Sequence, residues 1–122
     1  MSLVAKILVI EDNEQNLYLV SFILEREGHA VLQARTGELG IELAADVLPD
    51  LILLDIQLPY MDGYAVAETL RSNPQLQDVP IVAVTSYAMV GDRERVMAAG
   101  CSGYLEKPIN PETFVDDVAA YL

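Results

Sequence analysis

Five short apolar segments alternate along the chain with longer segments in which apolar residues recur at helical spacing. The expected strands are Lys6–Ile10, Ala30–Ala34, Leu51–Asp55, Ile81–Thr85 and Gly103–Glu106. Residues 51–54 read Leu-Ile-Leu-Leu, which is typical of a strand buried on both faces of a parallel sheet. Strict alternation of strands and helices implies right-handed crossovers. The pattern therefore predicts an α/β fold, a doubly wound five-stranded parallel sheet with five helices.

Residues with strong backbone preferences mark the ends of several expected helices. Gly28 and Gly100 lie where the first and fourth helices should end. Thr36 is a candidate N-cap of the second helix. Asn110 followed by Pro111 supplies an N-cap and a first-turn proline for the fifth helix.

Composition and charge narrow the function classes. The 122 residues predict one compact domain, residues 1–122, with a formal net charge of −12. That charge repels nucleic acid and anionic membranes, so neither is an expected partner. No apolar run reaches the roughly 20 residues of a membrane span, and no signal peptide is visible. The single cysteine, Cys101, excludes a disulfide within the chain and favours a cytoplasmic protein.

Ionisable and polar residues gather where the expected strands end. Glu11 and Asp12 follow the first strand, Asp55 and Thr85 end the third and fourth, and Lys107 follows the fifth. In doubly wound sheets, ligands bind at this carboxyl edge. Two carboxylates 5 Å apart repel by about 3 kcal/mol at an effective dielectric constant near 20, so three of them favour a cation. Oxygen ligands without histidine or cysteine suit Mg²⁺.

Each of these residues has an ordinary explanation when taken singly. An aspartate at a strand end, such as Asp55, is most often a helix cap or a turn residue. An acidic pair such as Glu11 and Asp12 suits the N-terminus of a helix. The prediction of function therefore rests on their joint arrangement at the same edge of the sheet.

Four stretches together resemble a known family. They are KILVIEDN (6–13), DLILLDIQLPYMDGYAV (50–66), PIVAVTSYA (80–88) and GYLEKPI (103–109). These stretches are similar to the CheY-like receiver domains of two-component response regulators, and the likeness extends from about residue 6 to residue 122. The resemblance implies a flavodoxin-like receiver fold with strand order 2-1-3-4-5. It also implies a phosphorylatable signalling switch of a two-component or phosphorelay system, rather than an enzyme acting on other substrates.

The same resemblance implies the roles of the acidic residues. Glu11 and Asp12 would hold Mg²⁺ (or Mn²⁺) together with Asp55 and the backbone carbonyl of Gln57. Asp55 would accept a phosphoryl group from a phosphohistidine of a histidine kinase or a histidine phosphotransfer protein. The physical chemistry agrees, because a cation beside Asp55 keeps this carboxylate ionised and nucleophilic.

Further residues receive roles in phosphoryl binding and switching by resemblance. Lys107 and Thr85 would contact the phosphoryl oxygens, and Tyr104 would move together with Thr85. This movement would remodel the surface of the fourth helix, fifth strand and fifth helix, where a downstream protein partner or an attached output domain would bind. The peptide bond between Lys107 and Pro108 is expected to be cis, as is usual in such receivers.

Three residues near the phosphoryl site are expected to tune its lifetime. Gln57 and Tyr87 would flank the path of the hydrolytic water. The small side chain of Ser86 would leave the phosphoryl group accessible.

The first expected helix carries more apolar residues than one buried stripe needs. The expected core stripe is Leu19, Val20, Ile23 and Leu24. The residues left partly or wholly outside the core are Leu17, Tyr18, Ser21 and Phe22. Leu17 and Ser21, with Tyr18 at the margin, are predicted to dock on the helical bundle of the phosphodonor. In the alternative, the fifth helix or a dimer contact covers Tyr18 and Phe22.

Two other functions share part of this pattern with the receiver domain. A haloacid-dehalogenase-type phosphatase also uses an aspartyl nucleophile, but it needs a second aspartate where this chain has Gln57. A flavodoxin needs a phosphate loop rich in Ser, Thr and Gly after the first strand, where this chain has EDNEQN. Within the receiver family, a stand-alone regulator and a receiver of a hybrid histidine kinase both remain open.

Overall fold

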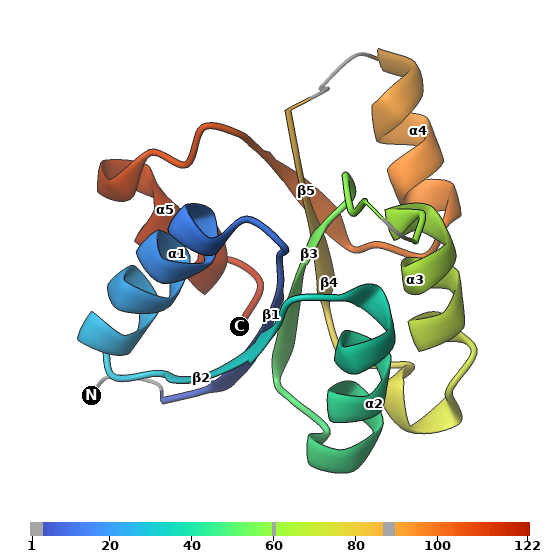
Figure 1. Ribbon diagram of the computed structural model, residues 1–122, viewed down its shortest axis with the longest axis horizontal. Helices are drawn as coiled ribbons and strands as arrows, with labels where there is room; N and C mark the ends of the chain where they lie inside the picture. The colour runs from blue at the N-terminus through green and yellow to red at the C-terminus, as the bar shows by residue number, and fades with distance from the viewer. Residues whose placement is uncertain (1–3, 60, 87–89) are drawn as a thin grey trace.

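The computed structural model describes residues 4–59, 61–86 and 90–122. A central sheet of five parallel strands lies between two layers of helices (Figure 1). The strands are β1 (Lys6–Ile10), β2 (Ala30–Ala34), β3 (Leu51–Asp55), β4 (Ile81–Thr85) and β5 (Gly103–Glu106). Their order in the sheet is β2-β1-β3-β4-β5. The predicted fold class, strand bounds and strand order are confirmed.

Five α-helices and one short 3₁₀ helix connect the strands. They are α1 (Glu14–Arg26), α2 (Gly37–Val47), α3 (Gly63–Arg71), α4 (Val90–Ala98), α5 (Pro111–Ala119) and the 3₁₀ helix η1 (Pro74–Leu76). In Figure 1, α1 and α5 cover one face of the sheet, and α2, α3 and α4 cover the other. None of the helices in the described part of the chain is long and apolar enough to cross a membrane.

Alternate strand residues enter two separate cores, one on each face of the sheet. Leu53 and Val82 pack with α1 and α5, whereas Leu54 and Ala83 pack with α3 and α4. Residues 51–55 of β3 are all buried, as expected for a central strand of a parallel sheet. Both faces of the central strands are therefore covered, and the polar residues of β3 and β4, Asp55 and Thr85, lie at the carboxyl ends of these strands.

The predicted helix ends are confirmed by their local geometry. The Thr36 hydroxyl accepts a hydrogen bond from the backbone N–H of Leu39 at 3.1 Å, and the Asn110 side chain accepts one from Glu112 at 3.0 Å. Gly28 and Gly100 have φ angles of +92° and +103°, and glycine adopts such angles without steric cost.

The predicted surface of α1 is partly wrong. Leu17 and Ser21 are only 4% and 3% exposed, so neither belongs to a docking face. Leu17 is buried because it packs in the core that α1 shares with α5. Ser21 is buried without loss because its hydroxyl accepts a hydrogen bond from Nε2 of Gln33 in β2 at 2.9 Å. Tyr18 and Phe22 remain exposed, at 69% and 52%.

Candidate functional site

Three carboxylates meet at the carboxyl edge of the sheet. Glu11 and Asp12 follow β1, and Asp55 is the last residue of β3. These strands are direct neighbours, with Ile10 paired to Leu54, so their ends lie side by side. Oxygen atoms of the three carboxylates lie within 4.8 Å of one another. Glu11 and Asp55 are buried and Asp12 is half-buried. The predicted convergence of the acidic residues is confirmed.

Lys107 supplies the positive charge of this site. Its Nζ lies 3.0 Å from Oε1 of Glu11 and 3.1 Å from Oδ2 of Asp55. The backbone N–H of Lys107 donates to the carbonyl of Thr85 at 2.9 Å, which ties the end of β5 to the end of β4. The peptide bond between Lys107 and Pro108 is cis, as predicted.

Burial and the neighbouring charges shift the pKa values of Glu11 and Lys107. The pKa of Glu11 is raised to about 7, chiefly by burial and then by the hydrogen bond to Asp55 and its charge, against a lowering by Lys107. Burial alone would lower the pKa of Lys107. The hydrogen bond to Glu11 and the charges of Asp55 and Glu11 outweigh that effect, so this pKa is raised. One ammonium therefore does not balance the three carboxylates.

The donor set suits a divalent cation. All three side chains of the cluster offer carboxylate oxygens, which are the ligands of hard cations such as Mg²⁺. A bound divalent cation would also offset the repulsion between these carboxylates, whose oxygen atoms lie within 4.8 Å of one another. The residues present therefore fit a divalent metal site.

Both oxygens of the Asp55 carboxylate are held. Oδ1 accepts a hydrogen bond from the backbone N–H of Gln57 at 2.9 Å, and Oδ2 faces Lys107. The side chain of Gln57 in turn accepts a hydrogen bond from the backbone N–H of Ser86 at 3.2 Å, and Ser86 is exposed. This link joins the loops after β3 and β4, and the sequence analysis did not anticipate it. Tyr87, predicted to flank the water path, lies outside the described residues.

Thr85 and Tyr104 lie on neighbouring strands. Thr85 is the buried last residue of β4, and Tyr104 is half-buried in β5, opposite Ala83. The Tyr104 hydroxyl accepts a hydrogen bond from Nε of Arg93 in α4 at 3.0 Å. The sequence analysis did not identify Arg93, because no local pattern pairs a helix residue with a particular residue of the next strand.

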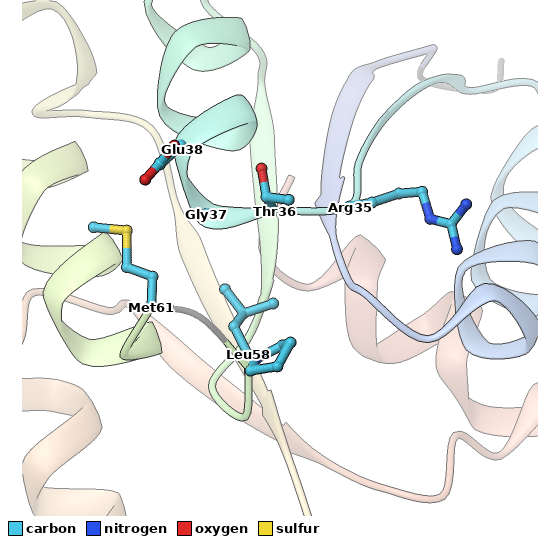
Figure 2. Close-up of a pocket in the computed structure, with 7 residues that line it drawn as sticks. Arg35, Thr36, Gly37, Glu38, Leu58 and Met61 are labelled. Carbon is cyan, nitrogen blue, oxygen red and sulfur yellow. The ribbon is translucent and has the colours of Figure 1, made fainter.

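A separate apolar cavity of about 230 Å³ opens beside the start of α2. Its lining residues are Arg35, Thr36, Gly37, Glu38, Leu58, Pro59 and Met61. Figure 2 shows the Leu58 and Met61 side chains near the start of α2, whereas the Arg35 side chain extends away. None of the three clustered carboxylates lines this cavity, so it is distinct from the charged site.

Comparison with known proteins identifies the family. The family model of the response regulator receiver domain matches residues 7–119. The chain belongs to this family. It is a response regulator receiver domain of two-component signalling, and nothing supports the phosphatase alternative.

Individual relatives resemble this receiver domain over nearly its whole length. The polar-differentiation response regulator DivK of Brucella ovis is 39% identical over 116 residues, which span 95% of this chain and 94% of that protein. The chemotaxis protein CheY4 of Vibrio cholerae has a similar structure, with a TM-score of 0.94 at 28% identity. That match covers 98% of this chain and 100% of the CheY4 chain.

A further solved structure bears on the metal site of the receiver domain. The receiver domain of the sensor histidine kinase PA1611 from Pseudomonas aeruginosa is 31% identical, with a TM-score of 0.89 and 98% of each chain covered. That structure has a magnesium ion coordinated in its active site cleft. Together with the acidic cluster described above, it supports divalent metal binding by this receiver domain.

Proposed function

We propose that this receiver domain accepts a phosphoryl group on Asp55 from a phosphohistidine of a histidine kinase or a histidine phosphotransfer protein. The observation that carries the proposal is the carboxylate of Asp55, held at Oδ2 by Lys107 at 3.1 Å and at Oδ1 by the N–H of Gln57. A carboxylate fixed in position beside a cation is suited to nucleophilic attack.

The metal of this site is proposed to be Mg²⁺ (or Mn²⁺). Glu11, Asp12, Asp55 and the backbone carbonyl of Gln57 would hold it. When bound, the ion neutralises carboxylate charge and stabilises charge on the phosphoryl oxygens.

In the proposed transfer, a carboxylate oxygen of Asp55 attacks the phosphorus atom of the phosphohistidine. The phosphorus–oxygen bond forms as the phosphorus–nitrogen bond breaks, and the imidazole departs with the electron pair. Lys107 and Thr85 would then contact the phosphoryl oxygens. Lys107 is already within 3.1 Å of Asp55, so little movement is needed. Water later attacks the phosphorus atom of the acyl phosphate, which releases inorganic phosphate and restores the carboxylate.

The proposed output is a change of surface. Thr85 would move toward the phosphoryl group and Tyr104 would follow it, which remodels the face formed by α4, β5 and α5. A downstream protein partner, or an output domain attached to the chain, would bind this face. Gln57, Ser86 and Tyr87 would set the lifetime of the phosphorylated form. The link between the Gln57 side chain and Ser86 supports such a role, since it lies between the two loops beside Asp55.

The proposed domain organisation and location of the protein agree with this function. Residues 1–122 would act as one receiver domain that catalyses only its own phosphorylation and dephosphorylation. A buried free cysteine, Cys101, suits a reducing compartment, which supports the cytoplasm as its location.

The proposed contact with the phosphodonor is centred on Tyr18 and Phe22 of α1. Their rings are stacked, with centroids 6.2 Å apart, and both are exposed. Tyr18 lies in the first half of α1 and Phe22 one turn further on, and the helix begins two residues after Asp12. A helical bundle docked there would bring its histidine toward Asp55. An exposed apolar pair of this kind is typical of an interaction site.

A small phosphodonor tests the proposed function. Incubation with acetyl phosphate and Mg²⁺ is expected to add one base-labile phosphoryl group to Asp55, detected by mass spectrometry. The variant Asp55→Asn should not be modified, whereas the control Asp46→Asn, an exposed acid of α2, should be modified normally. A phosphoryl group found on a serine or threonine would refute the mechanism.

A further inference from the structure

The side chain of Tyr104 is held from outside the sheet by one residue of α4. The Arg93 guanidinium donates to the Tyr104 hydroxyl through Nε at 3.0 Å and also through Nη2. Its central carbon lies 5.0 Å from the centroid of the Tyr104 ring, which is within the range of a cation–π contact. The negative charge of Glu106, two residues along β5, further favours the guanidinium at this position. Arg93 therefore engages both the ring and the hydroxyl of Tyr104.

A second arginine of α4 makes a similar contact with α3. The Arg95 guanidinium lies 4.0 Å from the centroid of the Tyr64 ring and 3.6 Å from the Asp62 carboxylate. In Figure 1, α4 lies beside α3. The two contacts are chemically alike, but only Arg93 reaches a residue of the proposed switch. Arg95 is thus a matched control for Arg93.

Resting on the proposed function, we propose that Arg93 is a positioning residue of the switch. It holds the Tyr104 side chain against α4, so that Tyr104 turns toward Thr85 only when the contact with Arg93 breaks. Tyr104 and Thr85 lie on adjacent strands, where Thr85 is paired with Glu106, two residues after Tyr104.

The consequence for phosphorylation follows from linkage. Arg93 is exposed, so its contact holds the Tyr104 hydroxyl at the surface, which is called here the outward position. In the proposal this contact is lost when Tyr104 turns inward toward Thr85, so it stabilises the unphosphorylated conformation. A ligand that binds the inward position must overcome the free energy of the contact between Arg93 and Tyr104. Loss of this contact therefore raises the apparent affinity for that ligand by the factor that corresponds to this free energy. An exposed cation–π contact corresponds to a factor of roughly two to five.

Titration with a phosphoryl mimic measures this factor. Beryllofluoride with Mg²⁺ is titrated into the wild-type protein, Arg93→Ala and Arg95→Ala, and the tyrosine ring signals are followed by NMR, with Tyr104 assigned from Tyr104→Phe. Arg93→Ala is expected to bind the mimic two- to five-fold more tightly. Its Tyr104 signal should already lie part of the way toward the mimic-bound position before any mimic is added. Arg95→Ala is expected to match the wild type in both respects.

Further variants separate positioning from a general effect on folding. Arg93→Lys keeps the charge but not the planar fork, so its affinity should lie between those of the wild type and Arg93→Ala. In a Tyr104→Ala background, Arg93→Ala should have no effect on affinity, because the contact is already absent. An unchanged affinity of Arg93→Ala, or an equal increase in Arg95→Ala, overturns the inference. If the wild type itself does not bind the mimic, or if Asp55→Asn binds it equally well, the proposed function fails and the inference fails with it.

Discussion

Asp12 is the least buried of the three carboxylates that meet at the carboxyl edge of the sheet. The Lys107 ammonium lies within 3.1 Å of the other two, Glu11 and Asp55, and forms its ion pairs with them. At the scale of single residues, Asp12 therefore adds negative charge to a cluster that already carries an excess. Neutralising the Asp12 carboxylate should therefore affect metal binding and folding stability in opposite directions.

We expect Asp12→Asn to weaken Mg²⁺ binding by roughly tenfold or more, because a charged ligand oxygen is lost. Without divalent cations the same variant should be more stable than the wild type by about 1 kcal/mol, because like-charge repulsion is relieved. Calorimetric titration with Mg²⁺ and urea unfolding in a chelator measure the two effects. The control Asp46→Asn should change neither, and equal Mg²⁺ binding by Asp12→Asn and the wild type would contradict the assignment.

Cys101 offers a prediction on pH at the same scale. Burial raises the pKa of its thiol to about 11, against a small opposing effect of the Arg71 charge. The unfolded chain loses the thiol proton at lower pH than the folded chain, so the folded state binds more protons above pH 9. The contribution of the Cys101 thiol to the free energy of unfolding should therefore be complete below pH 9 and decrease as the pH rises toward 11.

The prediction is measured as the difference in unfolding free energy between the wild type and Cys101→Ser across pH 8 to 11. The difference should change by about 1 kcal/mol or more in the direction that disfavours the wild type at high pH. Alkylation of the native protein at pH 8 should also be much slower than alkylation of the unfolded chain. Equal rates would show that the thiol is accessible.

At the scale of elements, Arg71 joins segments that the fold brings together from different parts of the chain. It ends α3, and its Nη1 donates to the carbonyls of Leu76 and Val79 at 2.8 Å and to that of Gln77 at 3.1 Å. Its Nε donates to the carbonyl of Gly100, after α4, at 2.9 Å. One guanidinium therefore donates hydrogen bonds to carbonyls in the segment before β4 and to one carbonyl after α4.

Arg71→Lys should destabilise the protein by about 1–2 kcal/mol, because an ammonium cannot reproduce the planar set of donors. Arg71→Ala should cost about 2–3 kcal/mol, because the same carbonyls all lose this donor and only that of Leu76 is known to keep another, the N–H of Val79 at 3.2 Å. Urea unfolding checks both values, with Arg26→Lys in the exposed last turn of α1 as the control. An Arg71→Lys variant as stable as the wild type would show that these hydrogen bonds contribute little.

The success of the sequence analysis differs between elements for physical reasons. Strand bounds follow from short apolar runs, and the convergence of Asp55 with Glu11 follows from the rule that parallel strands end at the same edge. The face of α1 does not follow, because the burial of Ser21 depends on a hydrogen bond from Gln33 of β2. The same limit applies to the link between Gln57 and Ser86, which are 29 residues apart.

At the scale of the whole molecule, the few basic residues are largely committed to internal contacts. The chain has seven Lys and Arg residues against nineteen Asp and Glu residues. Four of the seven bind carboxylates, carbonyls or tyrosines within the protein: Lys107, Arg71, Arg93 and Arg95. The surface offered to a partner is therefore strongly acidic.

We expect association with a phosphodonor to weaken as salt is added, since complementary charge on the partner is screened.

The exposed pair on α1 gives the last prediction at this scale. Tyr18→Ser and Phe22→Ser should slow phosphoryl transfer from a cognate histidine donor by roughly tenfold, because each removes a large exposed apolar side chain of the proposed contact. Transfer from acetyl phosphate should be unchanged, because that donor needs no docking surface. The control Met97→Ser removes an exposed apolar side chain from α4, on the other face of the sheet, and should leave both rates unchanged.

Leu17→Arg, by contrast, should unfold or strongly destabilise the protein, since Leu17 is buried against the core shared with α5. Equal losses with both donors in Tyr18→Ser would place this residue in the catalytic site or the fold rather than in the contact.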